Sequence, residues 1–129
     1  HLPESNAQNG VVIEAFLETA KRFVRGGYDV YVDGIVGPWF LEPWLGAARE
    51  GYDVYYIVLR ASREITLRRA VERSKLDLKT NTELVEVMWE QFCDLGKYEA
   101  NVIDTTAQTV SETVQSIKAH LKSGQNRIK

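Results

Sequence analysis

The sequence predicts an α/β fold, a three-layer αβα arrangement in which helices cover both faces of a mostly parallel sheet. Short segments rich in β-branched and aromatic residues, which suit strands, alternate with longer segments of helical periodicity. One of these segments, 53–59, is almost continuously apolar, as expected for a strand covered on both faces. Because strands that alternate with helices require right-handed crossovers, the strands are expected to run parallel.

The first half of the chain is predicted to contain a helix, a strand and a second, shorter helix. Apolar residues recur at helical spacing from about Asn6, and Gly26 and Gly27 end this helix. Residues 29–36 are predicted to form a strand because β-branched and aromatic side chains dominate them. A proline then opens a short helix over 38–49.

The second half is predicted to add three helices and a short strand. Serine or threonine residues, which commonly cap helices, stand at the predicted start of each of these helices. The elements predicted after the strand 53–59 are a helix from Ser62 to about Ser74, a loop over 75–81, a helix from Thr82 ended by Gly96, a strand over 101–104, and a helix from Ser111 ended by Gly124.

Length and composition are those of a single soluble domain that spans residues 1–129. With 44% hydrophobic and 26% charged residues, the composition is ordinary for a globular protein. The net charge of −2 and the lack of basic runs argue against nucleic acid or an anionic membrane as partner. No apolar run approaches the roughly 20 residues that span a bilayer, so a cytoplasmic protein is expected. A single cysteine, Cys93, excludes an internal disulfide and, with so few histidines, a Cys/His zinc site.

Asp33 is the best candidate for a functional acid. It follows the most strand-like part of the chain and precedes a glycine-rich segment. An acid in that position can hold a hydrated magnesium ion, directly or through water, next to nucleotide phosphates. A plain strand end with an Asp-Gly turn explains the same residues equally well. Trp39, a few residues later, either walls a small-molecule pocket or packs a short helix.

A second candidate site combines arginines with the end of the last predicted strand. Arg69 and Arg73 are four residues apart, so one helix face presents both. Two guanidiniums there could clamp a triphosphate and neutralise charge on a transferred group, and a solvated basic face is the alternative. Asp104 and Thr105 end the last strand, where a nucleotide base often rests in such folds; a plain turn is the alternative.

Five stretches of the sequence together resemble a group of bacterial P-loop proteins. The stretches are 2–9 (LPESNAQN), 26–41 (GGYDVYVDGIVGPWFL), 56–60 (YIVLR), 92–99 (FCDLGKYE) and 102–104 (VID). The group consists of small kinase-like NTPases, described as ATP-binding or AAA-family proteins and related to chloramphenicol phosphotransferase, gluconate kinase and the adenylate kinase fold. The resemblance extends over nearly the whole chain and does not specify a substrate.

The resemblance implies roles in a phosphotransferase that uses Mg-ATP. Asp33 matches the Walker B acid of the group, which supports magnesium or the acceptor. Arg69 and Arg73 lie where such kinases carry lid arginines that close over the phosphates. Asn9 and Trp39 would lie towards the pocket of the acceptor substrate.

The turn at Asp104 and Thr105 would lie near the adenine.

The defining element of the group is missing from these 129 residues. That element is a glycine-rich loop ending in Lys-Ser/Thr, whose backbone amides and lysine hold the phosphates. Gly46 and Gly51 have the spacing of two of its glycines, but no lysine follows them. The phosphate-binding loop and the strand before it are therefore absent from this chain.

In the group, that missing strand is central and lies between the strands that correspond to 29–36 and 53–59. The expected fold is therefore P-loop NTPase-like but without its central first strand, which leaves apolar strand edges open. Two situations would resolve this: the native protein has about 50 further N-terminal residues, as usual βαβ units suggest, or the chain forms a homodimer that covers the gap.

The function implied by the resemblance is that of the C-terminal portion of an ATP-dependent small-molecule kinase, inactive as this chain because the phosphate loop is absent. Mg-ATP would be the cofactor, and a small-molecule acceptor rather than nucleic acid or membrane would be the partner. The alternative is a non-catalytic interaction or scaffold remnant of the same fold, in dimeric form. The residues leave open whether the chain is an enzyme and which acceptor it would take.

Overall fold

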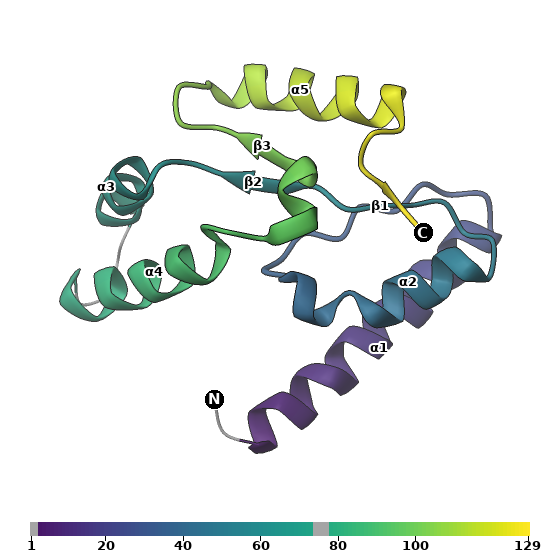
Figure 1. Cartoon of the computed structure of the whole chain (residues 1–129). Coiled ribbons are helices and arrows are strands. Elements are labelled where there is room, and N and C mark those ends of the chain that lie inside the picture. The colour runs from purple at the N-terminus through teal and green to yellow at the C-terminus, as the bar shows by residue number, and fades with distance from the viewer. Residues whose placement is uncertain (1–2, 74–77) are drawn as a thin grey trace. The chain divides into compact units, whose positions relative to one another are not determined.

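The computed structural model describes residues 3–73 and 78–129 (Figure 1). The chain divides into two compact units, His1–Val54 with Lys129 and Tyr55–Ile128, which we call the N-terminal unit and the C-terminal unit. Helices make up most of the described chain. The prediction of a single domain over 1–129 stays a prediction, and the two units are described separately.

The N-terminal unit contains α1 (Pro3–Arg25), the short η1 (Pro38–Phe40) and α2 (Glu42–Arg49). The predicted first helix is confirmed, although it begins at Pro3 rather than near Asn6. Gly27 follows it with a φ of 93°, in the left-handed region that glycine adopts readily, as expected for a helix stop. The predicted helix over 38–49 is interrupted, because a turn of 3₁₀ helix precedes α2.

Helices α1 and α2 pack against each other within this unit. Lys21 of α1 pairs with Glu50, just past the end of α2, with Nζ 2.8 Å from Oε2. Leu17 of α1 and Ala47 of α2 are both buried. An ion pair therefore joins the two helices, and each helix buries an apolar side chain.

The predicted strand over 29–36 does not form. Residues 28–37 have no helix or strand assignment, and no described residue of the N-terminal unit hydrogen-bonds to the backbone of 29–35. A strand needs a neighbour to pair its N–H and C=O groups, so a β-prone composition cannot form one alone. Tyr28, Tyr31 and Ile35 are consequently 65%, 81% and 67% exposed.

The described strands form two small sheets (Figure 1). β2 (Val58–Arg60) pairs in parallel with β3 (Val102–Asp104), and β1 (Val54–Tyr55) pairs with β4 (Arg127–Ile128). The predicted strand 53–59 is thus split between two sheets.

The prediction of a three-layer αβα fold with a mostly parallel sheet, P-loop NTPase-like without its first strand, is therefore wrong. The described chain is mostly helical, and each sheet has two strands. A broad parallel sheet would need 29–36 as an additional strand and an unbroken strand at 53–59. Neither condition holds, because 29–36 is not a strand, with no hydrogen bond from the described residues of its unit to the backbone of 29–35, and 53–59 divides between two partners.

The C-terminal unit also contains α3 (Arg63–Arg73), α4 (Leu78–Phe92), the short η2 (Gly96–Asn101) and α5 (Val110–Ser123). The cap predicted at Ser62 is confirmed, since its hydroxyl accepts an N–H from the first turn of α3 at 3.2 Å. Helices α3 and α4 pack together and connect β2 to β3. For this one pair of strands, the predicted combination of parallel pairing and a helical crossover is confirmed.

Two predicted boundaries of α4 are wrong. The helix already includes Leu78, so the cap predicted at Thr82 lies inside it. Residues 78–81, the described part of the loop predicted over 75–81, are helical. Residues 75–77 of that predicted loop lie outside the described residues. Helix α4 also ends at Phe92, four residues before the predicted stop at Gly96.

Helix α5 begins earlier than its predicted cap at Ser111. Thr109 is the cap: its hydroxyl accepts the N–H of Glu112 at 3.2 Å, and the Glu112 carboxylate accepts the N–H of Thr109 at 3.0 Å. This reciprocal capping box satisfies two backbone groups at once, which a cap at Ser111 would not do. The predicted stop at Gly124 is confirmed, with a φ of 73°.

A buried amide pair lies within the core of the C-terminal unit. Asn126 is 0% exposed, and its Nδ2 donates to the Asn101 carbonyl at 3.2 Å. Asn101 Nδ2 donates to the Tyr56 carbonyl at 2.9 Å.

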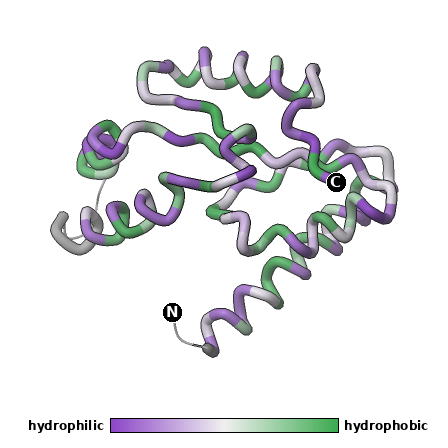
Figure 2. The backbone as a smooth tube through the Cα atoms, viewed as in Figure 1, coloured by the Kyte–Doolittle hydropathy of each residue, from purple (hydrophilic) through white to green (hydrophobic). Residues whose placement is uncertain are grey.

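Hydrophobic and hydrophilic residues both recur along α5 (Figure 2), which is the pattern of a helix with one apolar face. Among the described residues of this unit, the buried apolar side chains are Tyr56, Val58, Ala70, Leu95, Ile103 and Ile128.

Candidate functional site

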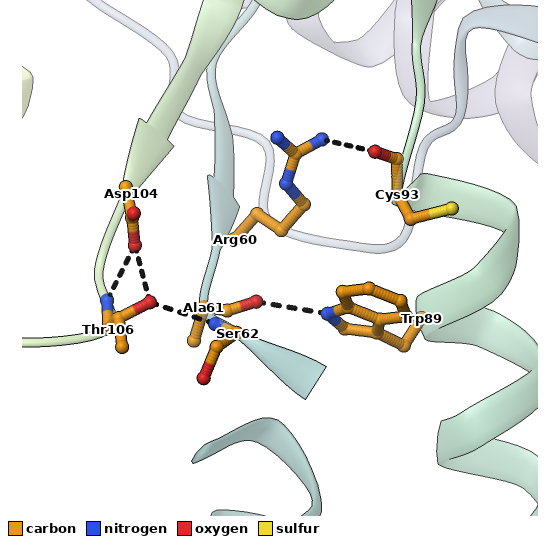
Figure 3. Close-up of a pocket in the computed structure, with 7 residues that line it drawn as sticks. All are labelled: Arg60, Ala61, Ser62, Trp89, Cys93, Asp104 and Thr106. Carbon is orange, nitrogen blue, oxygen red and sulfur yellow. Dashed lines mark hydrogen bonds between the residues drawn. The ribbon is translucent and has the colours of Figure 1, made fainter. Parts of the chain in front are cut away.

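The carboxyl ends of β2 and β3 meet at one edge of their sheet. The parallel register pairs Arg60, the last residue of β2, with Asp104, the last residue of β3. Ligands of open α/β sheets commonly bind just beyond such strand ends. A cavity of about 230 Å³ lies there, which we call the strand-end site; its lining residues are Arg60, Ala61, Ser62, Trp89, Cys93, Asp104 and Thr106 (Figure 3).

Arg60 is held by acceptors from α4 and η2. Its Nη1 and Nη2 donate to the two carboxylate oxygens of Glu99 at 2.7 and 2.8 Å, and Nη1 also donates to the Phe92 carbonyl at 2.9 Å. The hydrogen bonds from Arg60 lower the pKa of Glu99 to about 2, and Glu99 in turn raises the pKa of Arg60. Arg60 is therefore a charge-paired wall of the site rather than a free cation for ligand phosphates.

Asp104 is fixed by the turn that follows it. Its Oδ1 accepts the Thr106 N–H at 2.9 Å and the Thr106 hydroxyl at 2.5 Å, and these bonds lower the pKa of Asp104. Thr106 Oγ1 accepts the N–H of Ser62 at 2.8 Å, which ties the turn to the start of α3. Among the described residues none donates to Oδ2 of Asp104, so this oxygen is available to a donor on a ligand.

Trp89 and Cys93 line the site from α4 and the residue after it. Trp89 Nε1 donates to the Ala61 carbonyl at 3.0 Å, which orients the indole ring (Figure 3). The Cys93 thiol donates to the Glu90 carbonyl at 3.0 Å. Aromatic rings favour stacked or edge contacts with other planar groups. The strand-end site thus combines an oriented aromatic ring with an ionised carboxylate.

The structure brings together two residues that the sequence singled out for different roles. Arg69 of α3 donates from Nη2 to the Thr105 carbonyl at 3.0 Å and from Nη1 to its hydroxyl at 3.4 Å. Thr105 is buried. Arg73 lies one turn later on the same helix, is exposed, and donates from Nε to the Arg69 carbonyl at 3.2 Å. Arg69 therefore holds the turn after β3, while Arg73 lies on the surface of α3.

The other predicted site residues belong to the N-terminal unit. Asn9 lies on α1 and Trp39 in η1, and both are exposed. Asp33 lies in the segment without regular structure and is also exposed. The strand-end site is built without these three residues, since its lining comes from the C-terminal unit.

Asp33 fits magnesium only as one ligand among several. Within residues 3–73 and 78–129, no group of three or more His, Cys, Asp or Glu side chains lies close enough to hold a metal ion. Magnesium is commonly bound through one or two carboxylates together with water and substrate phosphates. A role for Asp33 therefore requires that phosphate oxygens and water complete the coordination.

Two contacts that hold the walls of the strand-end site have no signal in the sequence. Trp89 is oriented by its hydrogen bond to Ala61, 28 positions away, for which there is no local sequence signal. Glu99 pairs with Arg60 across 39 positions, so periodicity and capping patterns carry no information about it. The sequence feature that could have indicated the site is the pair of polar strand ends, Arg60 and Asp104, each of which directly follows an apolar run.

Comparisons with known proteins give no family for this chain. No protein-family model matches the sequence, and a search of curated proteins found no match. In the part of the chain that the structure describes, no helix has both the length and the apolar character needed to cross a membrane.

Proposed function

We propose that this chain is a portion of an ATP-dependent, kinase-like phosphotransferase that acts on a small molecule in the cytoplasm. The sequence resemblance to P-loop kinases suggests the ligand, Mg-ATP. One observation supports the location of its binding: Arg60, Asp104 and the start of α3 converge on a cavity at the carboxyl ends of two parallel strands. Parallel strand ends are where nucleotide ligands commonly bind.

The size of the strand-end site limits which part of the nucleotide it takes. A cavity of about 230 Å³ is smaller than the roughly 300–1,000 Å³ of typical ligand pockets. We therefore assign it the base, with the ribose and phosphates outside. Asp104 Oδ2 would accept from the exocyclic amine, and Trp89 would contact the ring.

The two candidate arginines of α3 have different roles in this proposal. Arg73 would contact them from the surface of α3, while Arg69 keeps the turn at Thr105 in place. The role of Asp33 as an acid that supports magnesium stays a prediction from the sequence, and the strand-end site does not depend on it. Because these 129 residues contain no glycine-rich loop ending in Lys-Ser/Thr, the chain by itself is proposed to bind nucleotide without transferring the phosphoryl group.

Calorimetric titration of the 129-residue chain with Mg-ATP tests this proposal. Binding is expected, and Asp104→Asn should weaken it about tenfold, because a hydrogen bond to a charged acceptor contributes roughly 1.5 kcal/mol. Asp29→Asn is the matched control, since it makes the same chemical change at an exposed residue of the N-terminal unit. No binding by the parent chain, or equal binding by the two variants, would contradict the proposal.

A second function, that of a non-catalytic interaction module, is favoured by the surface of the N-terminal unit. Apolar side chains on a soluble protein rarely gather in the open without a partner. In this unit they are exposed on α1 and on the segment that follows it: Val11, Val12, Phe16, Phe23, Val24, Tyr28, Val30, Tyr31, Val32, Ile35 and Trp39. Self-association of the chain is the direct test of this function.

A further inference from the structure

We propose that residues 29–35 pair with the same residues of a second copy of this chain, as an antiparallel two-stranded ribbon centred on Val32. The inference rests on the interaction function proposed above and is independent of nucleotide binding at the strand-end site.

The unpaired backbone of 29–35 is the first support for this ribbon. Within the N-terminal unit, no described residue hydrogen-bonds to the N–H or C=O groups of these seven positions. Yet Val30, Tyr31, Val32 and Ile35 are residue types enriched in strands. A β-prone segment with an unpaired backbone is a template for another strand, which would supply the missing hydrogen bonds.

The positions of the two aspartates exclude two ways in which 29–35 could pair with a second copy. An antiparallel ribbon centred on Tyr31 would place Asp29 opposite Asp33, and a parallel in-register pair would place each aspartate beside its own copy. Like charges directly opposite each other destabilise a strand pair. Centring on Val32 avoids both arrangements; the resulting pairs are Asp29 with Ile35, Val30 with Gly34, Tyr31 with Asp33, and Val32 with Val32.

Gly34 has room to adopt this arrangement. The chain bends at Gly34, and a Cβ added there would meet no atom within 4 Å in a single copy. Its φ is not in the left-handed region, so a side chain is compatible with the backbone. In the ribbon, Gly34 lies opposite Val30 of the second copy, where a larger apolar residue would add a cross-strand contact.

Exposed apolar surface next to the ribbon supplies further area for a dimer. Tyr28 and Tyr31 are 65% and 81% exposed, and an aromatic side chain can bury about 150–250 Å². Phe16 and Phe23 of α1, in the same unit, are 55% and 53% exposed. These aromatic side chains from two copies can provide much of the roughly 1,200 Å² that a specific interface requires.

The oligomeric state of the full chain, read across a dilution series by sedimentation equilibrium, tests the ribbon. We expect a reversible dimer, and hydrogen exchange measured by mass spectrometry should show that amides of 29–35 gain protection as the dimer forms. Val32→Asp places two carboxylates across the two-fold axis and should weaken the dimer about tenfold. Val110→Asp is the matched control, because it makes the same change at an 83% exposed residue of α5 and should leave the dimer unchanged.

A second variant keeps the test decisive if Val32→Asp fails to fold. Gly34→Val should tighten the dimer, since it adds a β-branched side chain in open space. A chain that stays monomeric overturns the ribbon, whether or not the amides of 29–35 are protected from hydrogen exchange within a single copy. A dimer that is indifferent to both variants also overturns it, while leaving the interaction function itself in place. Neither result affects the Mg-ATP titration.

Discussion

Arg60 and Glu99 form a doubly hydrogen-bonded ion pair that links the end of β2 to η2. The two guanidinium nitrogens donate to the two carboxylate oxygens at 2.7 and 2.8 Å, and Glu99 Oε2 also accepts the Leu95 N–H at 2.9 Å. A planar guanidinium matches a carboxylate in this two-bonded geometry, which fixes direction as well as distance. The pair therefore holds one wall of the strand-end site against the segment that leads into β3.

The Arg60–Glu99 pair predicts an acid-sensitive contribution to stability. The pKa of Glu99 falls from 4.5 to about 2 in the folded chain, chiefly because Arg60 donates to it. The stabilisation is therefore fully present above the unfolded-state pKa and is lost as the pH falls through the folded-state value.

Glu99→Gln should consequently lower the thermal midpoint at neutral pH. Between about pH 4.5 and pH 2, the thermal midpoint of this variant should decrease less than that of the parent chain. Glu90→Gln, at an exposed position of α4, is the control and should follow the parent chain. Circular dichroism melts at a series of pH values measure this. If Glu99→Gln loses stability on acidification as steeply as the parent, the pair does not contribute in the way described.

Thr109→Ala should destabilise the C-terminal unit by about 1 kcal/mol, the usual cost of losing a helix N-cap. The Thr109 hydroxyl accepts the Glu112 N–H, whereas Ser111 lies inside the helix with an exposed side chain. Ser111→Ala should therefore change stability by less than about 0.5 kcal/mol, as expected for most surface positions. Urea unfolding of the two variants distinguishes the caps; a larger loss for Ser111→Ala would contradict the capping box.

Asn126→Ala should cost roughly 1–3 kcal/mol, because it leaves buried polar partners without hydrogen bonds. Asn126 Nδ2 donates to the Asn101 carbonyl, so Oδ1 is the acceptor towards His120 Nδ1, 2.7 Å away, and that ring nitrogen carries the proton. Gln125→Ala changes the neighbouring exposed residue and is expected to be nearly neutral. Unfolding by urea again supplies the measurement, and equal stabilities of the two variants would exclude a stabilising role for the amide pair.

Helices were predictable from the sequence where their signals are local. The glycine stops of α1 and α5 and the cap at Ser62 each depend on residues a few positions apart, and the structure confirms them. The capping box at Thr109 shows the limit of such signals, since serine and threonine candidates two residues apart look alike until their hydrogen bonds are known.

Strands depend on pairing with distant residues, and there the sequence misled. The segment 29–36 has strand-like residues, but positions 29–35 have no backbone partner among the described residues of their unit, and 53–59 divides between β3 and β4 as partners. Periodicity reports which side chains suit a sheet, not which segments will meet. The three-layer fold was predicted from composition of this kind and fails for this reason.

The candidate site was predictable only in part. Asp104 and Thr105 stand at a strand end in the sequence and in the structure, and Arg69 lies against Thr105. The pairing of Arg60 with Glu99 and the position of Trp89 depend on how α4 and η2 fold back to the strands. Asp33 and Trp39 belong to the N-terminal unit, and no sequence motif indicates that the chain divides into two units.

Backbone-amide NMR of the isotopically labelled 129-residue chain, titrated with Mg-ATP, tests nucleotide binding at the strand-end site most directly. The chemical shifts should change first at Ala61 and Ser62 and at Thr105 and Thr106, the residues beside the paired ends of β2 and β3. Asp104→Asn should shift these changes to higher nucleotide concentration. Unchanged amides at these positions under saturating Mg-ATP, or changes confined to the N-terminal unit, would contradict a nucleotide site at the strand ends.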